Sequence, residues 1–148
     1  MMRQSWWKLR SILFAGLAVL SLACGSSTTA PSGNSAAGSY SPMLWITTGG
    51  SGQTSELQAG STLILNLNAD GTTSGHLHIA ASGSRSAVDA DMAGTWTQTG
   101  TTIRISQNAD TFIRNTSFEM SPDPVSGWDL AGDTNFASTH IQIILTPA

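Results

Sequence analysis

Two histidines separated by one residue, His76 and His78, are the side chains best spaced to bind a metal ion. Residues two apart on a β-strand project to the same side, so both imidazoles could ligate one ion. Two ligands do not complete a site, and the third histidine, His140, lies on a separate predicted strand. If Leu77 and Ile79 face the core, both histidines face solvent. We therefore predict no metal site and no cofactor.

The acidic and glycine-rich segments do not match a known catalytic or ion-binding motif. Asp70 opens a turn, and Asp89 and Asp91 lack the further carboxylates and terminal glutamate of a calcium loop. Residues 49–52 (GGSG) lack the spacing of a phosphate-binding loop, and there is no Gly-x-Ser-x-Gly elbow. No lysine follows Lys8, which excludes Schiff-base chemistry from the rest of the chain. We predict that the protein is not an enzyme, and we assign no catalytic residues.

The N-terminus has the anatomy of an export signal. Residues 1–10 contain three basic side chains, and residues 12–23 are an uninterrupted run of apolar and small residues. This run is shorter than the roughly 20 residues that a membrane-spanning helix needs. We predict that residues 1–23 are a cleavable signal peptide.

Cys24 is the single cysteine of the chain, so it cannot form an internal disulfide. Residues 20–25 (LSLACG) resemble the lipobox of bacterial lipoproteins, with Ala23 at the small position before the cysteine and Ser21 where leucine is usual. The resemblance implies cleavage between Ala23 and Cys24 and attachment of acyl chains such as palmitate to the cysteine sulfur. It places the protein in the cell envelope, and Gly25 at the next position favours the outer membrane of a two-membrane bacterium.

The region after the predicted cleavage site is poor in charge. Three arginines and nine acidic residues remain there, a formal charge of −6, without the basic clusters that nucleic acid or an anionic lipid surface attracts. Residues 24–37 are a Ser-, Gly- and Thr-rich segment without charge or large side chains, which predicts a flexible linker. Residues 38–148 are long enough for one domain.

The domain is expected to be all-β because short alternating segments are separated by glycine-containing turns. Leu63, Leu65 and Leu67 alternate with more polar neighbours, which places three leucines on one face of a strand. The predicted strands are residues 39–47, 61–68, 72–80, 93–99, 101–107, 111–120, 127–131 and 138–146. Consecutive tight hairpins indicate that neighbouring strands run antiparallel.

Four segments resemble the bacterial lipocalin-like domains of secreted lipoproteins. These are residues 38–40 (GSY), 60–63 (GSTL), 67–72 (LNADGT) and 94–103 (GTWTQTGTTI). The resemblance implies a single antiparallel, up-and-down barrel of about eight strands. It carries over no catalytic residues.

The interior of such a barrel is either packed solid or wide enough for one small ligand. Most of its aromatic residues are expected to fill the barrel or cap its ends; they are Tyr40, Trp45, Trp96, Phe112, Phe118, Trp128 and Phe136. Trp96 shares one side of its strand with Gly94 and Gln98, and a glycine there would leave room for a neighbouring side chain. We favour the packed interior.

These features favour a lipid-anchored binding or structural accessory module, with a small apolar ligand as the candidate partner besides the membrane. The alternative is an inhibitor of a lysozyme-like hydrolase. Residues 81–85 (ASGSR) resemble the Ser-Gly-x-Arg loop of periplasmic inhibitors of c-type lysozyme, although Ser86 stands where that family has tyrosine. A hydrolase is the third and least favoured hypothesis. The residues of a binding site are not predicted.

Overall fold

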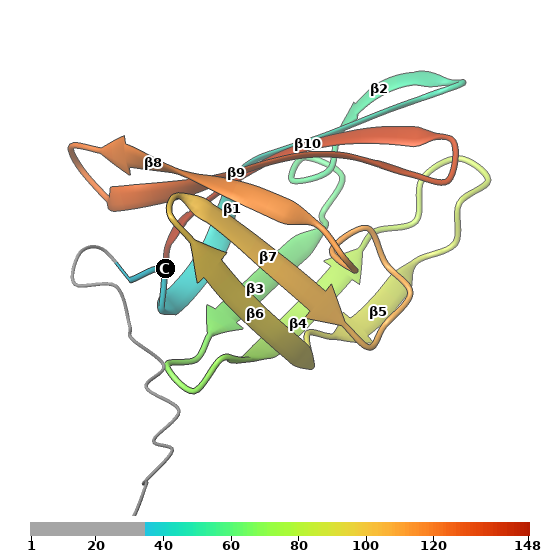
Figure 1. Cartoon of the computed structure of the whole chain (residues 1–148). Helices are drawn as coiled ribbons and strands as arrows, with labels where there is room; N and C mark the ends of the chain where they lie inside the picture. The colour runs from blue at the N-terminus through green and yellow to red at the C-terminus, as the bar shows by residue number, and fades with distance from the viewer. Residues whose placement is uncertain (1–34) are drawn as a thin grey trace, which may run out of the picture. The chain divides into compact units, whose positions relative to one another are not determined.

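The computed structural model describes residues 35–148, which form a closed antiparallel barrel of eight strands with two additional short strands (Figure 1). The strands are β1 (Gly38–Gly49), β2 (Gly52–Ser55), β3 (Thr62–Leu67), β4 (Thr72–Ile79), β5 (Val88–Asp91), β6 (Gly94–Thr99), β7 (Thr102–Gln107), β8 (Ser117–Asp123), β9 (Gly127–Phe136) and β10 (Thr139–Pro147). The predicted all-β class and the predicted barrel are confirmed.

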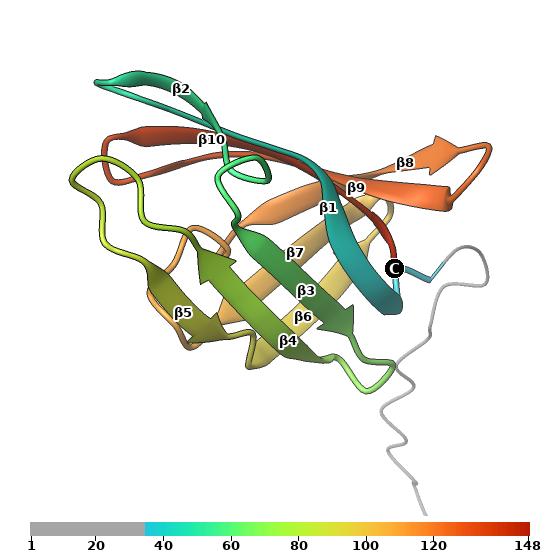
Figure 2. The ribbon, with the colours of Figure 1, turned by 180° about the vertical axis from the view of Figure 1, so that it is seen from behind.

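The barrel closes because the first and last strands pair along most of their length. The strand order is β10-β9-β8-β7-β6-β4-β3-β1, and β1 then pairs with β10 from Tyr40–Pro147 to Thr48–His140 (Figure 2). The register shifts between Pro42 and Leu44. Closure of this kind satisfies the backbone hydrogen-bonding groups that an open sheet would leave at its edges.

The core follows the alternation that the sequence shows. Leu63, Leu65 and Leu67 are each at most 2% exposed, whereas Ile64 between them is 44% exposed. Two further strands contribute inward-facing aliphatic side chains in the same way: Ile103, Ile105, Ile141, Ile143 and Leu145. The alternating residues of these strands therefore have the predicted orientation.

Two short strands were not predicted from the sequence. β2 pairs with the second half of β1 through a hairpin that turns at Gly50 and Ser51, and Gly52, the first residue of β2, has a φ of 105°. β5 pairs with the second half of β4, and β6 pairs with the beginning of β4 at only two positions. β2 (GQTS) has no apolar side chain, and β5 (VDAD) alternates apolar and polar residues over only four positions, so both sequences resemble loops.

The predicted strand over residues 111–120 is wrong in its first half, because residues 111–116 form turns and β8 begins at Ser117. Thr111, Phe112 and Ile113 are three consecutive buried residues, which a strand with one buried face cannot provide. Asn115 has a φ of 60°, a left-handed conformation that asparagine tolerates.

The barrel has two different ends (Figures 1 and 2). At one end, called here the hairpin end, the β3–β4, β6–β7 and β8–β9 connections are tight turns. At the other, called the loop end, the longer connections are residues 56–61, 80–87 and 108–116. The long connections can fold over the barrel mouth, whereas the tight turns cannot.

Three hydrogen bonds at the hairpin end involve the start of the described chain, the β3–β4 turn and β6. The Trp96 indole N–H donates to the Asn68 carbonyl at 2.8 Å, and the Tyr40 hydroxyl donates to the Ala36 carbonyl at 2.9 Å. The backbone N–H of Ala36 donates to Gln98 Oε1 at 3.0 Å. The Trp96 indole N–H and the Tyr40 hydroxyl thus both have partners in the protein.

Trp96 and Gln98 share a side of β6, as predicted, but Gly94 has a different role from the one expected. A Cβ at Gly94 would lie 2.0 Å from the Ser106 carbonyl oxygen. Glycine is required there because the backbone of the neighbouring strand approaches closely, and not because a side chain needs the space.

Candidate functional site

A cavity of about 150 Å³ lies at the loop end of the barrel. Its apolar lining comes from strands and loops that are distant in sequence: Trp45, Ile79, Val88, Phe112, Phe136 and Ile141. Trp45 and Phe112 form a tilted ring pair with centroids 5.3 Å apart. A mostly apolar concave site with a few polar groups is the usual form of a small-molecule site.

A buried ion pair forms part of the polar lining. The Glu56 side chain is 0% exposed, and it receives two hydrogen bonds from the Arg85 guanidinium: Nη1 to Oε1 at 2.7 Å and Nη2 to Oε2 at 2.8 Å. The Thr47 hydroxyl donates to Oε1 at 2.7 Å, and the Ser61 hydroxyl donates to Oε2 at 2.9 Å. Four donors thus satisfy both carboxylate oxygens, the condition under which a buried charge is tolerated.

The ion pair joins two loops across the barrel mouth. Glu56 is held by its backbone, because its N–H donates to the Trp45 carbonyl and its own carbonyl accepts from Ser61. Arg85 also donates from Nη2 to the Ala80 carbonyl at 2.9 Å. Residues 56–61 and 80–87 are therefore tied together at the mouth.

The environment keeps both partners of the pair ionised. Burial by itself raises the pKa of Glu56, but the hydrogen bonds from Arg85, Thr47 and Ser61 outweigh burial, and the pKa of Glu56 is lowered. The hydrogen bond to Glu56 raises the pKa of Arg85. The two charges neutralise each other, so the pair adds no net charge to the cavity.

Three residues that line the cavity have a buried polar atom without a hydrogen-bond partner in the protein: Trp45 Nε1, Arg85 Nε and Thr111 Oγ1. The indole and guanidinium nitrogens can only donate, whereas the hydroxyl can donate or accept. Most buried polar groups are hydrogen-bonded, so three residues of one cavity lining that each carry an unpaired buried atom are unusual. Among the described side chains, the other such atom is Gln107 Oε1.

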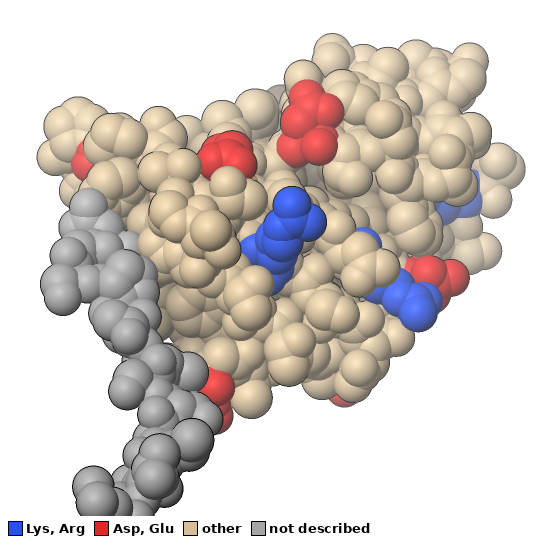
Figure 3. Space-filling model, viewed as in Figure 1, with Lys and Arg blue, Asp and Glu red and all other residues tan. Residues whose placement is uncertain are grey.

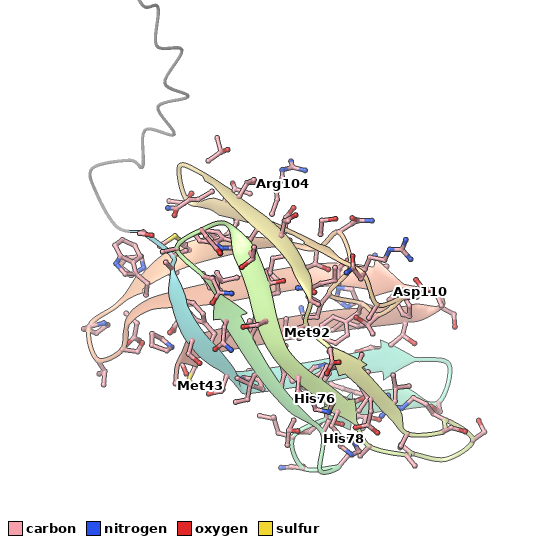
Figure 4. All side chains as sticks on the ribbon, turned by 90° about the horizontal axis from the view of Figure 1, so that it is seen from below. Met43, His76, His78, Met92, Arg104 and Asp110 are labelled. Carbon is pink, nitrogen blue, oxygen red and sulfur yellow. The ribbon has the colours of Figure 1, made fainter. Side chains whose placement is uncertain are left out.

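The predicted metal-ligand candidates form a separate, exposed cluster on β4 and β5. His76 and His78 both point outward from β4, as predicted, and Leu77 between them is buried (Figure 4). His78 Nδ1 lies 2.8 Å from Asp89 Oδ1, and His76 lies 3.3 Å from Asp89 and 3.4 Å from Asp91. Hydrogen bonds from His78 and His76 lower the pKa of Asp89.

The remaining candidates are separate from that cluster. His140 Nε2 lies within hydrogen-bonding distance of Asp133 Oδ1, at 2.7 Å. Asp70 accepts hydrogen bonds from the backbone and hydroxyl of Thr72, which is the predicted turn. Within residues 35–148, no group of three histidine, cysteine or acidic side chains could hold a metal ion.

Sequence reasoning missed Glu56, the residue that organises the barrel mouth. The sequence feature that could have indicated Glu56 is an isolated charge in a charge-poor stretch, directly before Leu57. Arg85 was singled out, but as part of a surface loop; its guanidinium is committed to Glu56. Ala23 and Cys24 lie outside the described residues, and their predicted processing is not addressed by this structure.

Charged side chains are sparse on the face shown in Figure 3, where most of the surface is uncharged and one blue side chain at the right touches a red one. No helix in the described region is long and apolar enough to cross a membrane. No protein-family model matches the chain, and comparisons with curated proteins and with solved structures gave no match.

Proposed function

We propose that the protein is a lipid-anchored lipoprotein of the bacterial cell envelope whose barrel binds a small, largely apolar molecule at the loop end. The observation that carries the binding proposal is the mostly apolar cavity there, formed by residues from strands and loops that are distant in sequence. The signal anatomy and the lone Cys24 support the anchor.

The contrast between the barrel interior and its mouth supports binding over a purely structural role. The strands pack buried aliphatic side chains against each other in the interior, whereas the mouth keeps an apolar cavity between loops. Packing in protein interiors is normally dense, and a retained cavity with polar groups at its wall is typical of a binding site.

Mass spectrometry of the protein purified from its native membrane tests both parts of this proposal. We expect acyl chains on Cys24 and a co-purifying small molecule in near-stoichiometric amount. A Cys24→Ser variant should lose labelling by fatty acid and should leave the membrane fraction or remain uncleaved. Continued fatty-acid labelling of this variant, or a cleaved form that still partitions into the membrane, would contradict the anchor, and the absence of any co-purifying molecule would contradict the binding role.

The alternative function, an inhibitor of a lysozyme-like hydrolase, gains no support from residues 81–85, the loop that suggested it. Arg85 makes three hydrogen bonds inside the protein, to Glu56 and to the Ala80 carbonyl, and is not a free side chain presented to a partner. A lysozyme assay with excess protein tests this alternative, and inhibition that is lost in Arg85→Ala would restore it.

A further inference from the structure

We infer that residues 121–129, called here the β8–β9 tip, contact the phospholipid surface that holds the lipid anchor, with Val125 at the boundary between headgroups and acyl chains. This inference rests on the proposed anchor and gives the barrel an orientation: the hairpin end faces the bilayer, and the mouth at the loop end opens away from it. It follows from the projection of the tip, its exposed apolar apex and the end of the barrel at which the described chain begins.

The β8–β9 tip projects beyond the barrel wall. Pairing of β8 with β7 ends at Glu119, and pairing of β9 with β10 ends at Leu130. The backbones of residues 121–129 lie beyond both limits and pair only with each other. The two strands of the tip therefore extend past their neighbours, at the same end of the barrel as the start of the described chain (Figures 1 and 2).

The apex of the tip is apolar and is held by hydrogen bonds. Val125 is 95% exposed, the largest exposed fraction among the large hydrophobic residues that the structure describes, and Pro124 beside it is also exposed. The backbone N–H groups of Val125 and Ser126 donate to the Asp123 carboxylate at 2.8 and 2.7 Å. The Ser126 hydroxyl donates to Asp129 at 2.9 Å. Because an isolated two-stranded hairpin is marginally stable in water, these bonds help to keep the apex ordered.

The position of the chain start favours contact between this end and the bilayer. Gly38, the first residue of β1, pairs with Leu67 directly before the β3–β4 turn, so the domain begins at the hairpin end. Residues 25–34 separate Cys24 from the described chain. A flexible chain of about ten residues has a root-mean-square length on the order of 20 Å. An anchor on Cys24 would therefore keep the hairpin end near the membrane.

The composition of the tip fits a lipid interface. Behind the apex, Trp128 packs partly against the core and is half-buried, and tryptophan rings are favoured at membrane interfaces. One exposed valine would bind a bilayer weakly on its own. The anchor makes the contact intramolecular, which raises the effective concentration of the tip at the surface and allows a weak contact to persist.

The acidic groups of the tip limit its depth and the lipids that suit it. Hydrogen bonds from the backbone of Ser126 and Val125 lower the pKa of Asp123, so this carboxylate stays ionised. Asp129 adds a second carboxylate, and no lysine or arginine follows Arg114 in the chain. Charged groups are costly in hydrocarbon, so the tip stops at headgroup level. Anionic lipids repel the carboxylates, and the surface that fits the tip is therefore zwitterionic.

The test places a nitroxide spin label on the mature lipoprotein in phosphatidylcholine vesicles. The label is attached to one introduced cysteine, since acylation blocks the sulfur of Cys24. Val125→Cys probes the tip, Ala69→Cys another turn of the hairpin end, and Ser84→Cys the loop end; all three positions are exposed. Accessibility to membrane-soluble oxygen, relative to a water-soluble nickel chelate, reports depth. We expect a ratio at least threefold higher at Val125 than at either control, and a lower ratio at Val125 when phosphatidylglycerol replaces part of the phosphatidylcholine.

Two unlabelled variants test the valine itself. Val125→Leu keeps an apolar apex and Val125→Asp removes it, and neither disturbs packing because the side chain is 95% exposed. Hydrogen exchange of residues 121–129 is measured for each lipoprotein on vesicles and for the matching Cys24→Ser protein without lipid. Lipidation should slow exchange at least threefold in the wild type and in Val125→Leu, and should leave it unchanged in Val125→Asp.

Several results would overturn the inference. Equal oxygen-to-nickel ratios at the three sites would leave the tip in water, and the highest ratio at Ser84 would put the loop end on the bilayer. Spin–spin broadening at Val125, with low accessibility to both reagents, would assign the tip to a second copy of the chain. Equal slowing in Val125→Asp and Val125→Leu would remove Val125 from the contact. Fatty-acid labelling of Cys24 decides the anchor separately, so a lipidated protein whose tip stays in water would refute the orientation alone.

Discussion

The two ends of the barrel each place a tryptophan near the core, but they treat its polar atom differently. At the hairpin end, the Trp96 indole N–H donates to the Asn68 carbonyl. At the loop end, the Trp45 indole N–H has no partner in the protein, although Trp45 is only 1% exposed. The tryptophan at the end with short turns is paired, whereas three of the four unpaired buried side-chain atoms of the described residues belong to residues that line the cavity at the end with long loops. Incomplete hydrogen bonding is thus concentrated where we place the ligand.

The largest predicted effect concerns the ion pair that holds the loop end together. Arg85→Met should destabilise the protein by about 3 to 5 kcal/mol, because it leaves the fully buried Glu56 carboxylate without its charge partner. Denaturant titration monitored by circular dichroism measures the free energy of unfolding.

The double variant Glu56→Leu/Arg85→Met is the control for this prediction. It should recover much of the lost stability, since removing both charges leaves no buried ion unpaired. A loss below about 1 kcal/mol in Arg85→Met would show that the pair does not hold the mouth together.

An intermediate effect should separate a paired threonine from an unpaired one. The Thr73 hydroxyl, near the hairpin end of β4, accepts from Gln107 Nε2 at 2.9 Å, whereas the Thr111 hydroxyl at the loop end has no partner. Thr73→Val should cost about 1 to 3 kcal/mol because Gln107 then loses its acceptor, and Thr111→Val should be close to neutral without ligand. Equal losses in the two variants would contradict the contrast between the ends.

The smallest predicted effect is a difference in acid sensitivity. The pKa of Glu56 is lowered in the folded protein, so its contribution to stability is fully present above the ordinary glutamate pKa of about 4.3 and is lost as pH falls through the folded pKa. The free energy of unfolding of the wild type should therefore decline more steeply below about pH 4.3 than that of Glu56→Leu/Arg85→Met. Titrations at a series of acidic pH values measure both slopes, and parallel slopes would contradict the prediction.

The strands could be predicted because their pattern is local. Leu63, Leu65 and Leu67 alternate within one strand, and the turn at Asp70 is stabilised by a hydrogen bond to Thr72 two residues away. The loop end depends on contacts that no local pattern encodes. Glu56 and Arg85 are 29 residues apart and meet only because β3 and β4 pair between them.

Two further elements escaped prediction because tertiary contacts override their local sequences. The segment at 111–116 is rich in residues that favour strands, yet it forms turns at the loop end of the barrel, where three consecutive side chains are buried. β5 (VDAD) has two aspartates in four residues, as a solvated loop often has. It is extended because it pairs with β4.

The two strands outside the closed ring, β2 and β5, affect how neighbouring molecules can meet. Each is paired on one side in the structure, β2 with β1 and β5 with β4, so each offers a free edge to which another chain could add. Both are four residues long, β2 has no apolar side chain, and β5 carries Asp89 and Asp91. Short, charged or polar edges discourage strand-to-strand aggregation. At high local concentration, as the proposed lipid anchor would produce, these edges favour separate barrels over a continuous intermolecular sheet.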